Sequence, residues 1–472
     1  MVLPAAEAVS LSTRGRTPSG DVALANPLAI HPNHRSSDPP REGLVAPPSE
    51  LFSMRNGVKA VVRRTWRSLP EPWRRRLRRH GEPALWQAYA HLFLARPAAA
   101  APPLPSAPLV VAGLFSTANG IGEAARSTWR ALTEAGLSPL AVDLSPFFAP
   151  MDLRSEIPLH SMPANERGTL ILQVNAPEVL PSLHHLGMGR ERSWYTVGYW
   201  AWELPAFPRG WEHALPFVSD VWAVSDFTSA ALALGGRGRR PHTIPHAVRI
   251  PPGTAPDRAR FALPPDSVIF LTMADTRSSL ARKNPEAVIS AFTAAFGDDE
   301  RQLLIVKTRG LAADPEARAS LVGAAGGAPN IRIMDESLSE GDRWRLILSC
   351  DVMVSLHRSE GFGLPLAEAM AAGRAVLATG WSGNLDFMSA CNSVLVGCTL
   401  RPVMDAYGVY ALPGAQWAEP DVRSASSQMV RLVREPNLRR RLGLQARKDL
   451  AEFASAGRVG RLMKERLEDS MG

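Results

Sequence analysis

The chain has only three cysteines in 472 residues, Cys350, Cys391 and Cys398. They are too few for a disulfide framework, and their spacing matches no zinc site. No run of about 18 apolar residues occurs, so we expect no segment that spans a membrane. A basic start followed by an apolar stretch is also missing at the N-terminus, so we expect no secretory signal. These absences predict a cytoplasmic protein.

Acidic residues are scarce in one segment, which accounts for the net charge of +8. Residues 55–96 contain eleven Lys and Arg but only two acids, Glu71 and Glu82, whereas the remaining chain is nearly neutral. No aromatic stacking motif accompanies these cations, so we expect no nucleic-acid partner. Val, Leu and Trp share helical spacing with Arg here, which predicts either peripheral attachment to an anionic membrane surface or a basic helix packed on the next domain.

The first hundred residues are unlike the rest in composition. Sixteen of the 41 prolines fall within residues 1–108. Residues 1–50 are rich in Pro, Ser, Arg and Ala without lasting periodicity, and we predict that they are disordered. Residues 51–107 are predicted to be a basic amphipathic helical extension followed by a linker.

From residue 109 onward, short apolar runs alternate with helical stretches, a pattern typical of βαβ units in an α/β fold. Two sets of six predicted strands flank a proline-rich hinge at 251–256; they are 109–115, 139–144, 169–174, 194–199, 220–224 and 242–245, then 268–274, 302–307, 330–334, 351–356, 374–379 and 393–396. The pattern predicts two facing Rossmann-like domains, 108–256 and 257–430. After Trp417 we expect only helices, including C-terminal helices over 431–472.

The strongest local motif follows the predicted strand 351–356. It reads Glu360-Gly361-Phe362-Gly363-Leu364-Pro365, with Glu368 inside the helix that begins near Leu364. A helix N-terminus favours a phosphate, and the glycines let the backbone approach a ligand closely. We place Glu360 at the sugar end of a nucleotide-sugar site and Glu368 near the ribose. The alternative is an ordinary strand–turn–helix with surface carboxylates.

This segment resembles the Glu-x7-Glu motif of the family-4 retaining glycosyltransferases, which have the GT-B fold. Similarity to a bacterial polysaccharide- and lipopolysaccharide-building subgroup extends over roughly 109–450, through Arg282-Lys283-Asn284-Pro285 and the segments 198–204, 245–248 and 379–386. The resemblance implies transfer of a hexose, such as mannose, from a nucleotide-diphosphate sugar to a polysaccharide or lipid-linked oligosaccharide. Neither cofactor nor metal is expected. A nucleotide-sugar epimerase or hydrolase of the same fold is the alternative enzyme.

The resemblance also implies roles for individual residues. Glu360 would bind donor-sugar hydroxyls, Glu368 would bind the ribose, and the Gly363 and Leu364 amides would face the diphosphate. Lys283 would neutralise the diphosphate as it leaves, since a preorganised cation stabilises charge that develops in the transition state. Two arginines, Arg277 and Arg282, compete for the role of assisting Lys283, and we favour Arg277 as the catalytic one, with Arg282 in donor binding.

A glycine-containing turn with Gly120 and Gly122 opens the first predicted helix of the first domain. As a dinucleotide fingerprint it is incomplete, because Ala125 takes the last glycine position, although alanine is tolerated there. This turn alone therefore does not exclude an enzyme that uses a nicotinamide cofactor. In the glycosyltransferases that the chain resembles, the turn closes over the diphosphate, and we favour that interpretation.

Candidates for the acceptor side come from the first domain. Trp200 and Trp202 could form an aromatic wall for an acceptor sugar or a lipid-linked acceptor, or they could simply pack in the core. Glu203 beside Trp202 could recognise the acceptor through its polar side chain, or it could be a simple acid at the start of a helix. His246 follows the last predicted strand of that domain. Asn175 occupies the place where many relatives have a histidine, so no catalytic histidine is expected there.

Overall fold

The computed structural model describes residues 86–104, 106–235, 240–405 and 408–471, all of which belong to one compact unit. The predicted disorder of residues 1–50 and most of the basic extension lie outside the described residues. The described part of the extension forms a helix through residues 86–93. Its Tyr89 hydroxyl lies 2.7 Å from His184 Nδ1 of the first domain.

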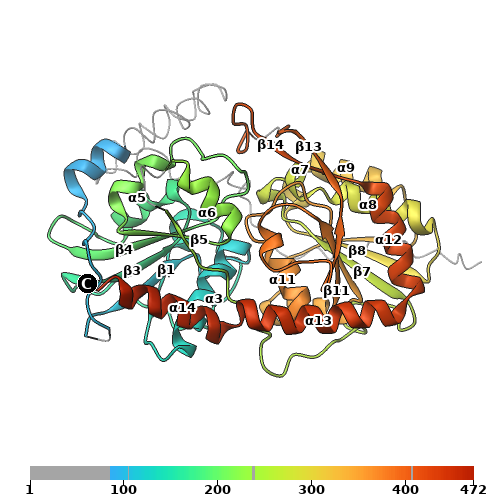
Figure 1. Ribbon diagram of the computed structural model, residues 1–472, viewed down its shortest axis with the longest axis horizontal. Helices are drawn as coiled ribbons and strands as arrows, with labels where there is room; N and C mark the ends of the chain where they lie inside the picture. Colours follow the sequence, from blue (N-terminus) through green and yellow to red (C-terminus); the bar gives the residue numbers. More distant parts are fainter. Residues whose placement is uncertain (1–85, 105, 236–239, 406–407, 472) are drawn as a thin grey trace, which may run out of the picture. The chain divides into compact units, whose positions relative to one another are not determined.

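The first domain is built on a six-stranded parallel sheet with strand order β2-β1-β3-β4-β5-β6 (Figure 1). Its strands are β1 (Leu109–Gly113), β2 (Leu140–Asp143), β3 (Arg167–Gln173), β4 (Ser193–Trp200), β5 (Asp220–Ala223) and β6 (His242–Thr243). The helices between them are α3 (Gly120–Glu134), α4 (Ser145–Phe148), α5 (Ala176–His185) and α6 (Asp226–Ala233).

The second domain repeats the scheme with strand order β12-β11-β10-β7-β8-β9. Its strands are β7 (Val268–Met273), β8 (Gln302–Thr308), β9 (Ile331–Asp335), β10 (Val352–Ser355), β11 (Ala375–Thr379) and β12 (Val394–Val396). Its helices are α7 (Leu280–Lys283), α8 (Pro285–Phe296), α9 (Pro315–Ala325), α10 (Glu340–Ser349), α11 (Leu364–Ala371) and α12 (Val422–Arg434). The two Rossmann-like sheets are confirmed. The strand order reverses between β7 and β10, where parallel α/β sheets commonly bind ligands.

One hairpin was not predicted. β13 (Cys398–Pro402) pairs antiparallel with β14 (Gln416–Pro420), so the expectation of helix alone after Trp417 is wrong for the first three residues. Trp417 and Ala418 are buried, whereas most of β13 is exposed. Such short strands are stabilised by pairing with each other, which a local apolar pattern does not reveal.

Two long helices end the described chain. α13 (Pro436–Ala454) packs on α11 and β11, whereas α14 (Ala456–Asp469) lies along α3 of the first domain (Figure 1). The buried face of α14 carries Val459, Met463 and Leu467 at helical spacing. The sequence suggested separate C-terminal helices after residue 430; the structure shows that α14 completes the first domain.

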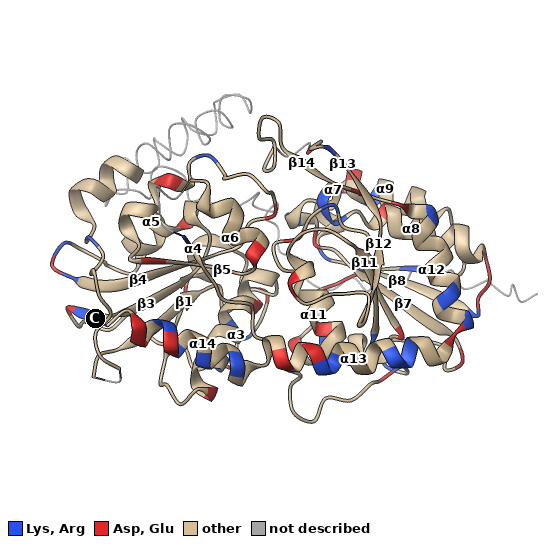
Figure 2. Cartoon of the chain, viewed as in Figure 1, with Lys and Arg blue, Asp and Glu red and all other residues tan. Residues whose placement is uncertain are grey.

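The outward faces of α13 and α14 carry both signs of charge (Figure 2). The pair of Lys464 and Glu468 on α14, 3.9 Å apart, is exposed and contributes little stability. None of the helices in the described ranges is both long and apolar enough to cross a membrane.

Candidate active site

A cavity of about 380 Å³ is lined by residues of both domains. The first domain supplies the turn before α3 and the carboxyl ends of β3 and β4, while the second supplies the segments after β7, β8, β9 and β10. The volume lies within the range of small-ligand sites. The cavity therefore lies where the carboxyl edges of two parallel sheets approach each other, which is the arrangement expected for a nucleotide-sugar site.

The predicted strand–turn–helix around Glu360 is confirmed. β10 ends at Ser355, and α11 begins at Leu364 directly after Gly363, whose φ of 92° favours glycine. Two hydrogen bonds fix the turn: Ser382 Oγ accepts from the Glu360 amide at 2.8 Å, and the Gly383 amide donates to the Glu360 carbonyl at 3.0 Å. The backbone therefore holds Glu360 at the cavity wall independently of any ligand.

Two cations flank the Glu360 carboxylate. Lys283 Nζ lies 2.5 Å from one oxygen, and Arg282 NH1 lies 3.2 Å from the other. Burial opposes ionisation of this side chain, but Lys283 and Arg282 lower the pKa of Glu360 to about 2. The carboxylate is thus charged throughout the physiological pH range and can accept hydrogen bonds from sugar hydroxyls.

The two competing arginines occupy different surroundings. Arg282 is 2% exposed, donates to the Ser359 carbonyl at 2.7 Å and contacts Glu360 directly. Arg277 has a half-buried side chain that pairs with Asp275 and Asp152. Both line the cavity, but Arg282 is the one that contacts the Glu360 carboxylate together with Lys283.

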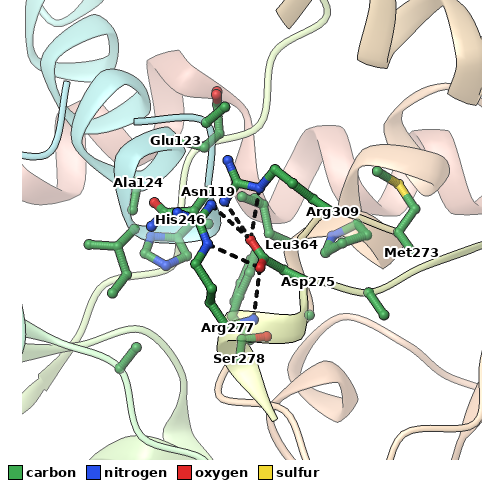
Figure 3. Close-up of a pocket in the computed structure, with 18 of the residues that line it drawn as sticks. Asn119, Glu123, Ala124, His246, Met273, Asp275, Arg277, Ser278, Arg309 and Leu364 are labelled. Carbon is green, nitrogen blue, oxygen red and sulfur yellow. Dashed lines mark hydrogen bonds and ion pairs between the residues drawn. The ribbon is translucent and has the colours of Figure 1, made fainter. Parts of the chain in front are cut away.

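The segment after β7 holds a cluster that the sequence did not reveal. Arg277 and Arg309 converge on the Asp275 carboxylate (Figure 3). Arg309 also pairs with Asp152 of the first domain at 3.0 Å. The only sequence signal for Arg309 is its place immediately after the buried strand β8, where side chains enter a Rossmann-type site.

Glu368 lies on α11 and is 2% exposed. Its carboxylate contacts Arg343 of α10, a residue that the sequence did not identify. Burial raises the pKa of Glu368 to about 7, with Glu123 adding to the increase and Arg343 opposing it. Glu360 and Glu368 line the same cavity.

The two glycines of the first-domain turn differ in their surroundings. Gly120 lines the cavity, and a Cβ there would meet no atom within 4 Å. Gly122 does not line the cavity; a Cβ at this position would lie 2.2 Å from the Thr117 carbonyl oxygen. Asn119 Oδ1 accepts from the Gly122 amide at 2.7 Å and caps α3. The structure thus places Gly120 at the site and gives Gly122 a packing role instead.

Asn175, Glu203 and His246 line the first-domain side of the cavity. Asn175 Oδ1 accepts from the Ala201 amide at 2.9 Å, which fixes the end of β4. Burial lowers the pKa of His246 to about 4, against the opposing charge of Glu123, so this ring is neutral at pH 7. The ring packs edge-on against Phe362, with centroids 5.2 Å apart.

The predicted aromatic acceptor wall is corrected. Trp200 is fully buried and Trp202 is 5% exposed, and neither lines the cavity. Both pack on Trp211, at 5.8 and 5.3 Å between ring centroids. β4 is an interior strand, so core packing surrounds these rings and leaves Glu203 at the cavity.

The two domains match known glycosyltransferase structures. The Anabaena protein HepE, solved with UDP and glucose, aligns with a TM-score of 0.56 and 11% identity over 77% of this chain and 100% of its own. Sucrose-phosphate synthase from Thermosynechococcus elongatus aligns with a TM-score of 0.56 and 14% identity over 77% of this chain and 98% of its own. The chain has the GT-B fold.

Sequence comparison adds a family match within this GT-B fold. Residues 257–393 match the model of the family described as glycosyl transferases group 1. No curated protein sequence matches the chain. The chain spans 55% of the S. aureus TarM mutant chain solved with UDP, at 12% identity over 64% of this chain and a TM-score of 0.47. The family match covers the GT-B domain that holds Lys283, Glu360 and Glu368.

No group of three or more His, Cys, Asp or Glu side chains that could hold a metal ion occurs within the described ranges. The charged side chains of the GT-B site form alternating cation–carboxylate contacts instead. Lys283 and Arg282 hold Glu360, and Arg343 holds Glu368. The cations that an anionic ligand would meet are thus already paired with carboxylates of the protein.

Proposed function

We propose that this GT-B protein is a retaining glycosyltransferase that moves a hexose from a nucleotide-diphosphate sugar to a glycan or lipid-linked glycan. The observation that carries this proposal is the cluster of Lys283, Arg282 and Glu360 at the carboxyl edge of the second sheet, in the part of the chain that matches group 1 glycosyltransferases. The UDP and glucose in the HepE structure support a nucleotide sugar as donor.

Each part of the site has a role in this reaction. The bond between the anomeric carbon and the diphosphate breaks, and the departing diphosphate gains negative charge next to Lys283 and Arg282. A cation that is already in place stabilises this charge at little reorganisation cost. The N-terminus of α11, at Gly363 and Leu364, offers backbone amides to the same phosphates. Glu360 would accept hydrogen bonds from donor-sugar hydroxyls.

Retention follows from attack on the face that the diphosphate leaves. The acceptor hydroxyl forms the new bond to the anomeric carbon and passes its proton to a phosphate oxygen of the leaving group. No enzymic nucleophile is needed in this reaction. The site supports this, because His246, with a pKa lowered to about 4, is a weak base and Glu360 is held by two cations. Glu203 and the side-chain amide of Asn175 would meet the acceptor.

The motifs that resemble the family-4 bacterial polysaccharide subgroup support a polysaccharide or lipid-linked oligosaccharide as acceptor and a hexose such as mannose as the transferred sugar. Peripheral attachment to an anionic membrane through residues 55–96 would bring the enzyme to a lipid-linked acceptor. Residues 55–85 of that segment lie outside the described residues.

The test supplies the full-length protein with UDP-glucose, UDP-N-acetylglucosamine or GDP-mannose and a lipid-linked or oligosaccharide acceptor. Nucleoside diphosphate release that requires the acceptor, with a product whose anomeric configuration by NMR matches the donor's, supports the proposal. Release without acceptor would indicate a hydrolase, and a changed sugar on an intact nucleotide would indicate an epimerase. An inverted product would overturn the retaining assignment.

Metal independence is part of the proposal. Treatment with EDTA is expected to leave the initial rate of transfer unchanged, because Lys283, Arg282 and the α11 amides provide the positive charge that faces the diphosphate. The measurement compares rates after dialysis against EDTA with rates after adding Mg²⁺ or Mn²⁺. A loss of activity that only a divalent cation restores would contradict this expectation.

A further inference from the structure

The contact between Glu368 and Arg343 belongs to a charged cluster that crosses from one domain to the other. Arg343 NH2 also lies 3.2 Å from Glu123 Oε2 on α3, so one guanidinium joins a carboxylate of the second domain to one of the first. Arg130 extends the link by pairing with Glu340 at 2.7 Å. Glu123, Glu340, Arg343 and Glu368 of this cluster line the cavity, whereas Lys283 and Glu360 belong to a separate cluster.

Arg343 contacts only one oxygen of Glu368. The guanidinium binds Oε1, while Oε2 has no hydrogen-bond or ion-pair partner within the described residues. Because α11 is packed and Glu368 is 2% exposed, the guanidinium restricts the direction in which Oε2 points. A carboxylate that is held through one oxygen can accept hydrogen bonds from neighbouring hydroxyls through the other.

We propose that Arg343 is a positioning residue that orients Glu368 for hydrogen bonding to the ribose hydroxyls of the nucleotide and favours its ionised form, and that Glu123 competes with Glu368 for Arg343. This proposal rests on the proposed function, because it assumes that the cavity binds a nucleotide. It makes the selection of ribose over deoxyribose depend on a residue that does not itself touch the sugar.

The charges around Glu368 make its ionisation depend strongly on Arg343. They come from α10, from α3 and from the segment after β6, and comprise Arg343, Glu340, Glu123, Arg130 and Arg249. Burial already raises the pKa of Glu368 to about 7 with Arg343 in place. Loss of the guanidinium would raise this pKa further, so Glu368 would be neutral at pH 7 and a poorer hydrogen-bond acceptor. Loss of the Glu123 charge would lower it.

The test measures dissociation constants by calorimetry for UDP, GDP and their 2′-deoxy counterparts, between pH 6 and 9, with the full-length protein. The wild-type protein should prefer the ribonucleotide increasingly as Glu368 ionises. Comparing ribo and deoxy forms cancels the titration of the phosphate itself. Arg343→Met should weaken ribonucleotide binding at pH 7 by about 10- to 100-fold, the loss expected for a hydrogen bond to a charged group, and the preference for ribose should largely disappear.

Two variants separate positioning from folding. Arg345→Met is the matched control, because Arg345 lies on the same helix but pairs with Asp342, and it should bind like wild type. Glu123→Gln should move the onset of ribose preference to lower pH, whereas Arg343→Met should move it to higher pH. A damaged fold cannot produce opposite shifts.

Equal weakening of ribo and deoxy forms in Arg343→Met, with an unchanged ratio, would overturn the proposal and leave Arg343 a structural role only. Unchanged affinity in that variant would overturn it as well. If the wild-type protein bound neither UDP nor GDP, the proposed function would fail first and the inference with it.

Discussion

Lys283→Met is expected to lower kcat for sugar transfer by about 100- to 1,000-fold, the loss typical for removal of one preorganised charge-stabilising group. The Lys283 ammonium lies 2.5 Å from Glu360 at the cavity wall, where the departing diphosphate would collect charge. Methionine keeps the length of the side chain but not its charge. Arg282 still pairs with Glu360, so the variant should fold.

The measurement is a single-turnover transfer rate at saturating donor, together with a thermal melt of each protein. Arg277→Met is the comparison, because Arg277 also lines the cavity but pairs with Asp275 rather than Glu360. We expect it to change kcat by less than about tenfold. A Lys283→Met enzyme with nearly full activity and a wild-type melt would remove Lys283 from the site. A larger loss in Arg277→Met would favour Arg277 over Arg282 as the partner of Lys283.

Gly460→Leu is expected to lower the free energy of unfolding by about 3 kcal/mol, near the upper end of typical overpacking costs. A Cβ at Gly460 would lie 2.0 Å from the carbonyl oxygen of Ala131 on α3. Backbone atoms cannot yield as a side chain can, so α14 would have to move away from the first domain. The buried Val459 and Met463 would then lose part of their packing.

Urea unfolding followed by tryptophan fluorescence measures this effect, since Trp129 lies on α3 itself. Gly457→Ala in the same helix is the control. There the nearest atom to a new Cβ is Glu134 Oε1 at 3.0 Å, the end of a flexible side chain, so stability should change by no more than about 0.5 kcal/mol. Equal midpoints for Gly460→Leu and wild type would show that α14 does not depend on this close contact.

Local patterns in the sequence were sufficient for both sheets. All twelve parallel strands overlap the predicted segments, and the interior strands are short apolar runs because they are covered on both faces and need side chains that pack in a core. The β13–β14 hairpin lacked this signal, since β13 is mostly exposed. Burial of interior strands also explains why the predicted aromatic wall was wrong. Trp200 and Trp202 lie near the end of β4, which suggested a binding surface, but β4 lies inside the sheet.

The sequence located the cavity residues that belong to short motifs or follow a predicted strand. Glu360 and Glu368 share one turn and helix, and Lys283 belongs to a short motif. Arg343 and Glu123 lie in separate domains, and their significance arises only when α10 and α3 meet. The spacing of residues along the chain cannot predict this contact, because the contact depends on how the two domains pack against each other.

Because α14 packs on α3 of the first domain, it determines the order in which the two domains can finish folding. Residues 108–256 emerge from the ribosome well before residues 456–469, so the face of α3 that α14 contacts stays uncovered while the second domain is synthesised. The first domain therefore completes its packing last. A chimera that exchanges this domain with a related enzyme would need to exchange α14 with it, although some two hundred residues separate the two pieces.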